Sequence, residues 1–316
     1  MPVLPPLKSF FDAMIAPKPE DPEAPVADAR AAMHTMMTQS FGALSRPVAP
    51  APSERDHKVP VAGGEITVRV YGPGDGGPVS PCYLHLHGGG FWLGTLDHSD
   101  NLCRSIAAAA GCVVVSVDYR LAPEHKFPAA PEDSYAALVW VAAHAAELGI
   151  DPARIAVGGG SAGGNLAAVV SLMARDRGGP RIVQQILEIP VTDLTRLEPI
   201  RFPDEDLVVE SGKAQYGGYY LADPADATHP YASPMLAQDL SGLPPALVMC
   251  AQYDPLQPEG EAYAKRLAES GVPVDYRCWE GQFHGSQGMA ALIPEEAAAY
   301  HVQVVQTLRR AFACQG

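Results

Sequence analysis

The sequence lacks the cysteine spacing that marks a disulfide framework or a zinc site. None of its six cysteines forms a CxxC pair, and several stand inside apolar runs. Cysteines of this kind are typical of reduced core residues in a cytosolic protein. We therefore expect neither a disulfide framework nor a cysteine-based metal site. The six residues are Cys82, Cys103, Cys112, Cys250, Cys278 and Cys314.

Long hydrophobic runs and an excess of basic charge are missing too. Lys8 and Asp12 interrupt the apolar residues near the N-terminus, so this stretch resembles neither a signal peptide nor a membrane span. The formal net charge is −14, whereas a nucleic-acid-binding protein needs a basic face. We expect a cytoplasmic protein with no membrane span and no nucleic-acid partner, whose acidity serves solubility.

The apolar pattern that is present predicts one large α/β domain. With 316 residues and 47% hydrophobic content, the chain can bury a single large core. Helical spacing predicts about two helices before residue 45, and a hairpin follows around Gly63 and Gly64. Buried strands then alternate with helices, which implies a mostly parallel central sheet with helices on both faces. Strands are expected at 82–87, 113–117, 155–158, 186–191, 246–251 and 274–279, and helices at 133–148, after 161, at 259–270 and at 294–313.

One interval breaks this alternation. The residues between Val191 and Ala246 contain no buried-strand pattern but are rich in tyrosine. The interval is too long for an ordinary connection between two elements. We therefore expect it to be a lid or cap insertion.

The stretch Arg154–Asn165 reads as a buried strand, a very tight turn and a helix. Ser161 stands at the turn, inside the Gly-x-Ser-x-Gly pattern of 159–163 that is typical of a nucleophile elbow. Such a serine sits on a strained turn, and side chains two residues before and after it would collide with the strand and helix. Glycine at both places removes the collision.

The same glycines allow two other interpretations. Gly158, Gly160 and Gly163 also spell the GxGxxG of a dinucleotide-binding turn, with Asp176 as a possible ribose ligand. The stretch is also compatible with a glycine-rich turn that has no chemistry. Short glycine motifs are weak evidence, so the rest of the chain must decide.

Acyl transfer by a serine needs a base, an acid that orients the base, and donors for the developing oxyanion. Asp254 and His284 follow Ser161 in the order that serine hydrolases with this elbow use. Each lies just past a predicted strand, where catalytic groups gather in open α/β sheets. We predict that these three residues form a catalytic triad.

The motif HGGG at 87–90 supplies the missing donors. Glycine lets the backbone approach a substrate closely, so the N–H groups of Gly88 and Gly89, together with that of Ala162, are predicted to form the oxyanion hole. The dinucleotide interpretation leaves this motif unexplained.

These motifs together resemble the hormone-sensitive-lipase family of α/β hydrolases, in its bacterial esterase branch. The resemblance extends from about residue 57 to the C-terminus and keeps the family's order. The segments that carry it are HGGGFWLG (87–94), DYRLAPEHKFPAAPED (118–133), GGSAGGN (159–165), PVTDLT (190–195), YASPM (231–235), LPPALVMCAQYDPL (243–256) and FHG (283–285).

The resemblance implies a serine carboxylesterase with an α/β-hydrolase fold and a helical cap. Ser161 would be the nucleophile, His284 the base and Asp254 its partner. The substrate would be a small-molecule ester with a short to medium acyl group, and neither a metal nor a cofactor is expected. Family members are often dimers, so a homodimer is possible here. Alternatives are a lactone, acetyl-ester or amide hydrolase with the same triad and a non-catalytic receptor, which the three retained triad residues disfavour.

The family cap is built from N-terminal helices and an insertion, which divides this chain into four parts. We predict that residues 1–50 form the N-terminal part of the cap and 194–235 the cap insertion. Residues 51–193 and 236–316 would then form the two parts of the hydrolase core.

The chain departs from the family pattern in three places. Gly160 precedes the nucleophile where relatives usually carry Asp or Thr, and Pro258 stands where many carry a second acid. Ser286 replaces a bulky apolar residue after FHG, which would open the pocket. The predicted substrate pocket, for which plain packing is the alternative, is lined by Phe91, Trp92, Tyr216, Tyr220 and Ser286.

Other polar residues are expected to be structural. His85 and His87 alternate on one strand face, but no carboxylate or cysteine cluster accompanies them, so core and turn roles are favoured over metal binding. Asp118, Arg120 and Glu124 are expected to form an ion and hydrogen-bond network beside the site.

Overall fold

The computed structural model describes residues 2–15, 26–36, 38, 44–73, 79–197, 199–202, 207–209 and 212–313. Near the N-terminus a short 3₁₀ turn, Pro5–Leu7, leads into α1 (Lys8–Ile15), and α2 (Val26–Met36) follows. The predicted pair of N-terminal helices is confirmed.

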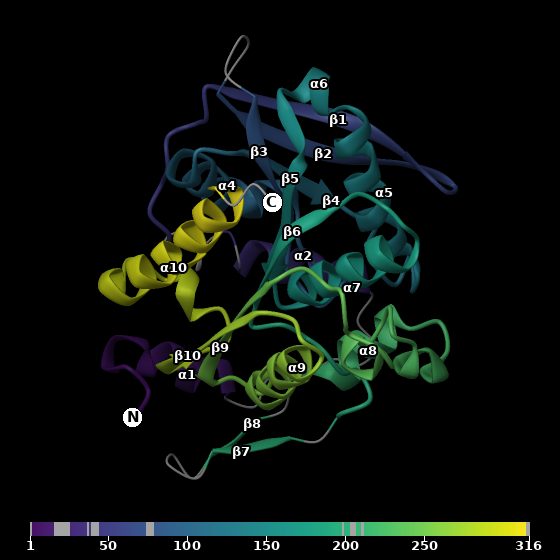
Figure 1. Ribbon diagram of the computed structural model, residues 1–316. Helices are drawn as coiled ribbons and strands as arrows, with labels where there is room; N and C mark the ends of the chain where they lie inside the picture. Colours follow the sequence, from purple (N-terminus) through teal and green to yellow (C-terminus); the bar gives the residue numbers. More distant parts are fainter. Residues whose placement is uncertain are drawn as a thin grey trace.

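A single eight-stranded sheet forms the centre of the molecule (Figure 1), in the order β1-β2-β4-β3-β5-β6-β9-β10. The first two strands form the predicted hairpin, and β2 pairs antiparallel with β4. All other neighbours pair parallel, as predicted. The strands are β1 (Ser53–Val61), β2 (Gly64–Gly72), β3 (Ser80–Leu86), β4 (Val113–Asp118), β5 (Ile150–Gly160), β6 (Ile182–Glu188), β9 (Ala246–Tyr253) and β10 (Val274–Phe283).

Helices cover both faces of this sheet. In Figure 1, α4 and α10 lie on one side of the strands and α5 and α7 on the other. Side chains that alternate along a strand reach opposite faces: Leu84 and Leu86 belong to the cluster shared with α7, whereas Tyr83 packs in the cluster of α4 and α10. The helices are α4 (Leu96–Ala110), α5 (Ala129–Ala143), α6 (Ala145–Leu148), α7 (Ala162–Asp176), α9 (Gln257–Glu269) and α10 (Pro294–Ala313).

The structure differs from the sequence-based prediction at two helices. The segment 133–148 is divided between two helices, because helical structure is interrupted at His144. Helix α4 is not predicted from the sequence pattern. The signals for α4 were present: Thr95 caps its N-terminus, and Gly111 ends it in the left-handed conformation. Its many polar residues hide a buried stripe formed by Leu96, Ser99, Cys103, Ile106 and Ala110.

Strand β6 also ends at an earlier residue than the sequence pattern predicts. The strand ends at Glu188, not at Val191, because Ile189 has a φ of 41° and Pro190 has no N–H to donate to a neighbouring strand. The segment after Glu188 is thereby free to turn toward Ser161.

The tyrosine-rich interval contains the short hairpin of β7 (Ile200–Phe202) and β8 (Leu207–Val209), then α8 (Lys213–Tyr220). Two 3₁₀ turns follow it, at Pro224–Thr228 and Pro234–Leu236. Figure 1 shows α8 beside α9, at the edge of the molecule that also holds the carboxyl end of β9. The limits of the four predicted parts stay a prediction.

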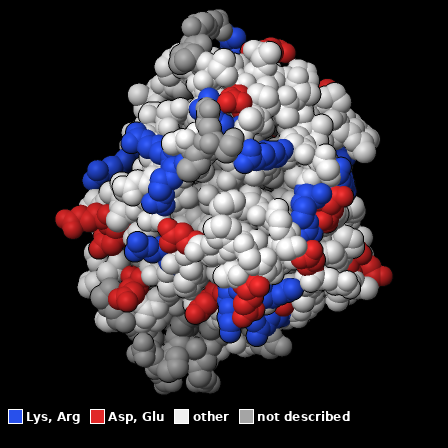
Figure 2. Space-filling view, in the orientation of Figure 1, with Lys and Arg blue, Asp and Glu red and all other residues white. Residues whose placement is uncertain are grey.

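The charged surface, the hydropathy of the helices and the state of the cysteines can each be compared with the sequence-based predictions. On the face in Figure 2, acidic and basic side chains lie among one another and neither sign covers the face. Within the described ranges, no helix is both long and apolar enough to cross a membrane. The five described cysteines are free thiols, and Cys314 lies outside the described residues.

Candidate active site

Ser161 stands on a strained turn between β5 and α7. Its φ of 58° and ψ of −117° are unfavourable for a residue with a side chain. The turn is held from both sides, since the Ser161 N–H donates to the carbonyl of Glu188 (2.8 Å) and its C=O accepts from Val191 N (3.3 Å) and Asn165 N (3.0 Å). The strain is therefore fixed by neighbouring backbone.

The glycines around Ser161 differ in how much room they have. A Cβ on Gly159 would lie 2.0 Å from the carbonyl oxygen of Leu86, and one on Gly163 only 1.9 Å from it. At Gly160 the nearest atom, the carbonyl oxygen of Glu188, would be 3.9 Å away. Two glycines are thus required by the close crossing over β3, whereas the departure at position 160 leaves open space.

The predicted triad residues lie together at the carboxyl edge of the sheet. Ser161 follows β5, Asp254 follows β9 and His284 follows β10. His284 Nε2 lies 3.1 Å from Ser161 Oγ, and His284 Nδ1 lies 2.7 Å from Asp254 Oδ2. Because an ionised carboxylate only accepts, Nδ1–H donates to Asp254 and Nε2 is left to accept the serine hydroxyl.

The surroundings of His284 stabilise its protonated form. Burial lowers the pKa of His284, but the charge of Asp254 and its hydrogen bond raise that pKa, and the net shift is upward. Asp254 is fully buried, and its second oxygen accepts the Leu256 N–H at 2.8 Å. The carboxylate therefore orients the ring without the second acid, and Pro258 instead lies in the first turn of α9.

The turn that carries His284 is held by Ser286. The Ser286 hydroxyl donates to Gln282 Oε1 (3.2 Å) and accepts from Phe283 N (3.3 Å). It begins a short 3₁₀ turn, Ser286–Gly288, and its side chain has no exposed surface. In this conformation Ser286 supports the turn and does not open onto a pocket.

Helix α1 braces the residues next to the triad. The Phe11 ring lies 5.8 Å from the ring of Tyr253 and 5.5 Å from that of Phe283. These two aromatic residues directly precede Asp254 and His284. The N-terminal segment therefore contributes to the geometry of the site.

Two of the three predicted oxyanion donors, Gly88 and Ala162, lie next to Ser161. A Cβ on Gly88 would meet Gly160 O at 2.8 Å and Ser161 Cβ at 3.6 Å, so this glycine lies beside the nucleophile. In the part of the chain that the structure describes, no acceptor takes the N–H of Gly88 or Gly89. Ala162 is the first residue of α7, where N–H groups have no acceptor within the helix and attract negative charge.

The predicted pocket residues divide into two sets. Phe91 and Tyr220 are fully buried and stack on each other, with ring centroids 3.9 Å apart. Trp92 is 7% exposed and packs against Tyr219, and Tyr216 keeps partly exposed surface. Trp92 and Tyr216 can therefore face a ligand, whereas Phe91 and Tyr220 support them.

The prediction that Asp118, Arg120 and Glu124 form one network with each other is wrong. Arg120 makes two hydrogen bonds to the buried carboxylate of Asp133, at 2.7 and 2.8 Å. Glu124 pairs with Arg30 of α2 at 2.7 Å. Neighbours in the sequence could not reveal these partners, because α5 and α2 bring them from elsewhere.

His85, in β3, and His87, directly after it, are both buried. Burial lowers the pKa of His85 to about 3 and that of His87 to about 4. The His87 ring stacks on Tyr119 at 4.2 Å, and its Nδ1 lies 2.8 Å from Gly88 O. Among the described residues, no group of three or more His, Cys, Asp or Glu side chains is placed to hold a metal.

The dinucleotide interpretation loses its ribose ligand. Asp176 is the last residue of α7 and accepts from Arg175. A helix of this length separates its ends by about 20 Å, so Asp176 lies far from Gly160 at the other end.

Sequence reasoning missed a buried ion pair beside the site, between Lys213 of α8 and Glu259 of α9. The two side chains are only 2% and 4% exposed. Glu259 directly follows the unusual Pro258, and this position is a signal in the sequence for an acid near the site. Nothing in the sequence around Lys213 indicated burial.

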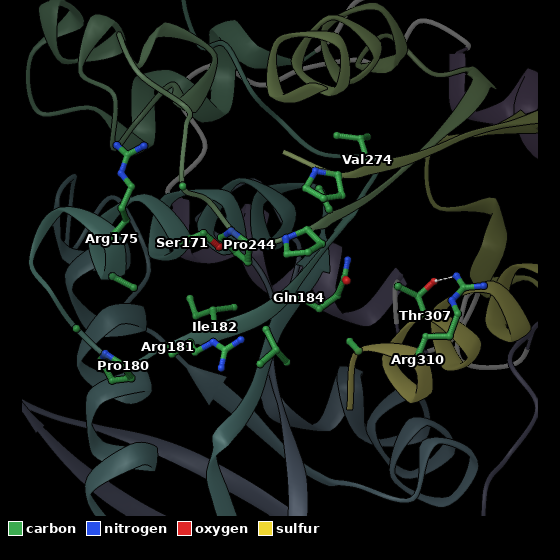
Figure 3. A pocket seen from close by; sticks show the side chains of 18 of the residues that line it. Ser171, Arg175, Pro180, Arg181, Ile182, Gln184, Pro244, Val274, Thr307 and Arg310 are labelled. Carbon is green, nitrogen blue, oxygen red and sulfur yellow. Dashed lines mark hydrogen bonds between the residues drawn. The ribbon is translucent and has the colours of Figure 1, made fainter. Parts of the chain in front are cut away.

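An open cavity of about 870 Å³ lies at the opposite edge of the sheet (Figure 3). Its walls include Ile182, Ala246 and Val274, which begin β6, β9 and β10. None of the predicted site residues lines it. The cavity is therefore separate from the triad.

Known proteins resemble this chain along most of its length. A family model described as alpha/beta hydrolase fold matches residues 83–288. Carboxylic ester hydrolase LipN of Mycobacterium tuberculosis is 44% identical over 262 residues, covering 80% of this chain and 69% of LipN. Esterase LipI of the same organism is 42% identical over 264 residues, covering 80% and 81%. A solved hyperthermophilic esterase from the archaeon Pyrobaculum calidifontis has a TM-score of 0.87 at 40% identity, covering 98% of this chain and 99% of its own.

The crossing over β3 gives a first prediction. Gly163→Ala should lower the free energy of unfolding by about 1–3 kcal/mol or more, because the new methyl group must displace the Leu86 carbonyl. Gly160→Ala is the matched control and should change it by about 0.5 kcal/mol or less. Urea unfolding of both variants checks this, and equal losses would contradict the assigned packing.

A second prediction concerns the titration of His284. In Asp254→Asn the charge that raises its pKa is gone while the burial that lowers it remains, so the pKa should fall below its ordinary value. Histidine NMR titrations of both proteins, with the signal assigned from His284→Gln, measure the change. An unaltered pKa would show that Asp254 does not control the ring.

Proposed function

Because the chain belongs to the bacterial esterase branch of the hormone-sensitive-lipase family of α/β hydrolases, we propose that Ser161, His284 and Asp254 are its catalytic triad and that short to medium acyl esters are its substrates. The protein is a carboxylic ester hydrolase, like the relatives that carry this activity in their names. Its residue roles and its acyl range are the proposal.

The hydrogen-bond chain from Ser161 through His284 to Asp254 carries the assignment of roles. Ser161 Oγ attacks the ester carbonyl carbon while His284 Nε2 takes the serine proton. The bond between the acyl carbon and the alkoxy oxygen then breaks, and the leaving alcohol takes this proton. Water repeats the steps on the acyl-enzyme: His284 takes a proton from the water and returns it to Ser161.

The amides of Gly88, Gly89 and Ala162 would stabilise the oxyanion of each tetrahedral intermediate. Their N–H groups are fixed before the substrate arrives, so little reorganisation accompanies the reaction. Loss of one such donor typically costs about 3–4 kcal/mol of transition-state stabilisation.

The proposed acyl range rests on how closely α8 covers residues 88–91, here called the oxyanion loop. A Cβ on Gly90 would lie 3.1 Å from Tyr216 Cβ and 3.3 Å from Trp92 Cδ1. Aromatic side chains thus stand directly against Gly90, which follows the two glycines that would hold the ester oxygen. We propose that this aromatic cover favours short and medium acyl groups over long chains.

The homodimer and the cytoplasmic location are two further predictions. β10 is an edge strand of the sheet, which is where a homodimer would form. The cytoplasmic location rests on the sequence composition.

Replacing the nucleophile gives the most direct test. Ser161→Ala should lower the turnover of p-nitrophenyl butyrate about a millionfold, because the triad acts as a unit. Ser171→Ala, which replaces a buried serine farther along α7 whose hydroxyl donates to Ala167 O, should keep wild-type turnover.

A series of p-nitrophenyl esters from acetyl to long-chain acyl, measured on wild type and both variants, completes this experiment. Rates should peak at short or medium chains. Residual wild-type-like turnover in Ser161→Ala would reject the assigned nucleophile, and a peak at long chains would reject the proposed acyl range.

The pH dependence tests the assigned base. Only neutral His284 can accept the serine proton, so kcat/KM should be low when the ring is protonated and rise as it loses its proton. Since Asp254 shifts the pKa upward, the midpoint should lie above the ordinary 6.5. Rates from about pH 5 to about 9 measure the profile, and a flat profile would exclude His284 as the base.

A further inference from the structure

The buried ion pair between Lys213 and Glu259 joins two segments that meet at the candidate site. Lys213 Nζ pairs with Glu259 Oε2 and donates to Asp193 O at 2.8 Å. The other carboxylate oxygen, Oε1, accepts the Thr192 N–H at 2.8 Å. The pair therefore links α8 to α9 and to the segment that follows β6.

The segment after β6 supports the nucleophile. Val191 N donates to the Ser161 carbonyl at 3.3 Å, and Asn165 Nδ2 donates to Val191 O at 2.9 Å. Glu259 binds the next residue, Thr192, through both its carboxylate and its backbone carbonyl. One end of the ion pair is thus attached to the backbone that holds Ser161.

The other end of the pair is attached to the oxyanion loop through α8. The Tyr216 Cβ lies against Gly90, where an added methyl group would be 3.1 Å away. The Tyr220 ring stacks on Phe91 at 3.9 Å and 8°. Phe91 has a φ of 66° and Gly90 one of 58°, so α8 packs on a strained turn that directly follows Gly88 and Gly89.

Helix α8 cannot hold this position by itself. It has eight residues, two adjacent glycines in its middle, and no side-chain cap at its N-terminus. Such a helix is marginal without tertiary contacts. Its C-terminal end is held by Lys126, which donates to Gly218 O and Leu221 O, whereas Lys213 holds its N-terminal end.

Burying both charges is costly unless they pair and their remaining groups find partners. Burial raises the pKa of the Glu259 carboxyl, and the Lys213 ammonium and the backbone donors oppose that shift. A neutral pair could fill the same space, so stability alone does not explain a charged one. The charged pair is explained if it fixes the separation between α8 and the Thr192 backbone.

We propose that Lys213, paired with Glu259, is a positioning residue that sets the oxyanion loop against Ser161. The inference rests on the proposed ester hydrolysis and deepens it. The pair touches neither substrate nor reacting atoms. It fixes the distance between the Gly88 and Gly89 donors and the nucleophile, an interaction that matters most in the transition state.

The test compares Lys213→Met with Lys265→Met in hydrolysis of p-nitrophenyl butyrate. Lys265 is on α9 and, like Lys213, has a nearby acid, Glu269, but that pair is 3.9 Å apart and exposed. Lys213→Met should lose about 10- to 100-fold in kcat at nearly constant KM, because oxyanion donors act in the transition state. Lys265→Met should match wild type.

A trifluoromethyl ketone, which adds to the serine and places an oxyanion in the hole, provides an independent readout. Its affinity for Lys213→Met should fall by about the same factor as kcat/KM. The double variant Lys213→Met with Glu259→Gln leaves no uncompensated buried charge, so thermal unfolding should show it closer to wild type in stability than Lys213→Met. It should keep the loss in kcat.

The outcomes separate positioning from stability. Wild-type kcat in the double variant, or a raised KM at unchanged kcat, would overturn the positioning role. If Lys213→Met does not fold, the double variant decides. Absence of turnover in wild type and Lys265→Met alike would reject the ester hydrolysis itself, and this inference with it.

Discussion

The contact on which the site depends is the crossing of the Ser161 turn over the end of β3. Gly159 and Gly163 bring the turn so close to the Leu86 carbonyl that no side chain fits at either position. This closeness carries the chain into α7 with Ser161 in a strained conformation. It also places Ser161, the proposed nucleophile, beside Gly88, which lies just past the end of the same strand. The proposed nucleophile and Gly88, a proposed oxyanion donor, therefore share one packing constraint.

The parallel sheet supplies the remaining alignment. Strands β5, β9 and β10 run in the same direction, so the residues that follow them emerge at one edge. Ser161, Asp254 and His284 come from these three ends and can form a hydrogen-bond chain although long stretches of sequence separate them. Two segments outside the sheet refine the positions. Helix α1 packs against the residues before Asp254 and His284, and α8 packs against the turn after Gly89.

Buried charge has two different uses near this site. Asp254 is fully buried and its charge faces the imidazole of His284, where it raises the pKa of a group that exchanges a proton in the proposed mechanism. Glu259 is equally hidden but faces an ammonium and backbone N–H groups, none of which exchanges a proton in the reaction. The same chemical group thus tunes a base in one place and fixes backbone positions in the other, according to its partners.

The sequence by itself determined the parallel sheet, the Ser161 elbow and the order of Ser161, Asp254 and His284, because these depend on short-range patterns: β-branched runs, glycines at fixed offsets and residues just after strands. It could not determine partners that come from distant segments. Arg120 pairs with Asp133 and Glu124 with Arg30, contrary to expectation, and Ser286 turned inward to support the turn of His284. Lys213 looked like any surface lysine. Only the tertiary structure decided these cases, because burial and pairing of a polar side chain depend on which element packs against it, and no local spacing encodes that.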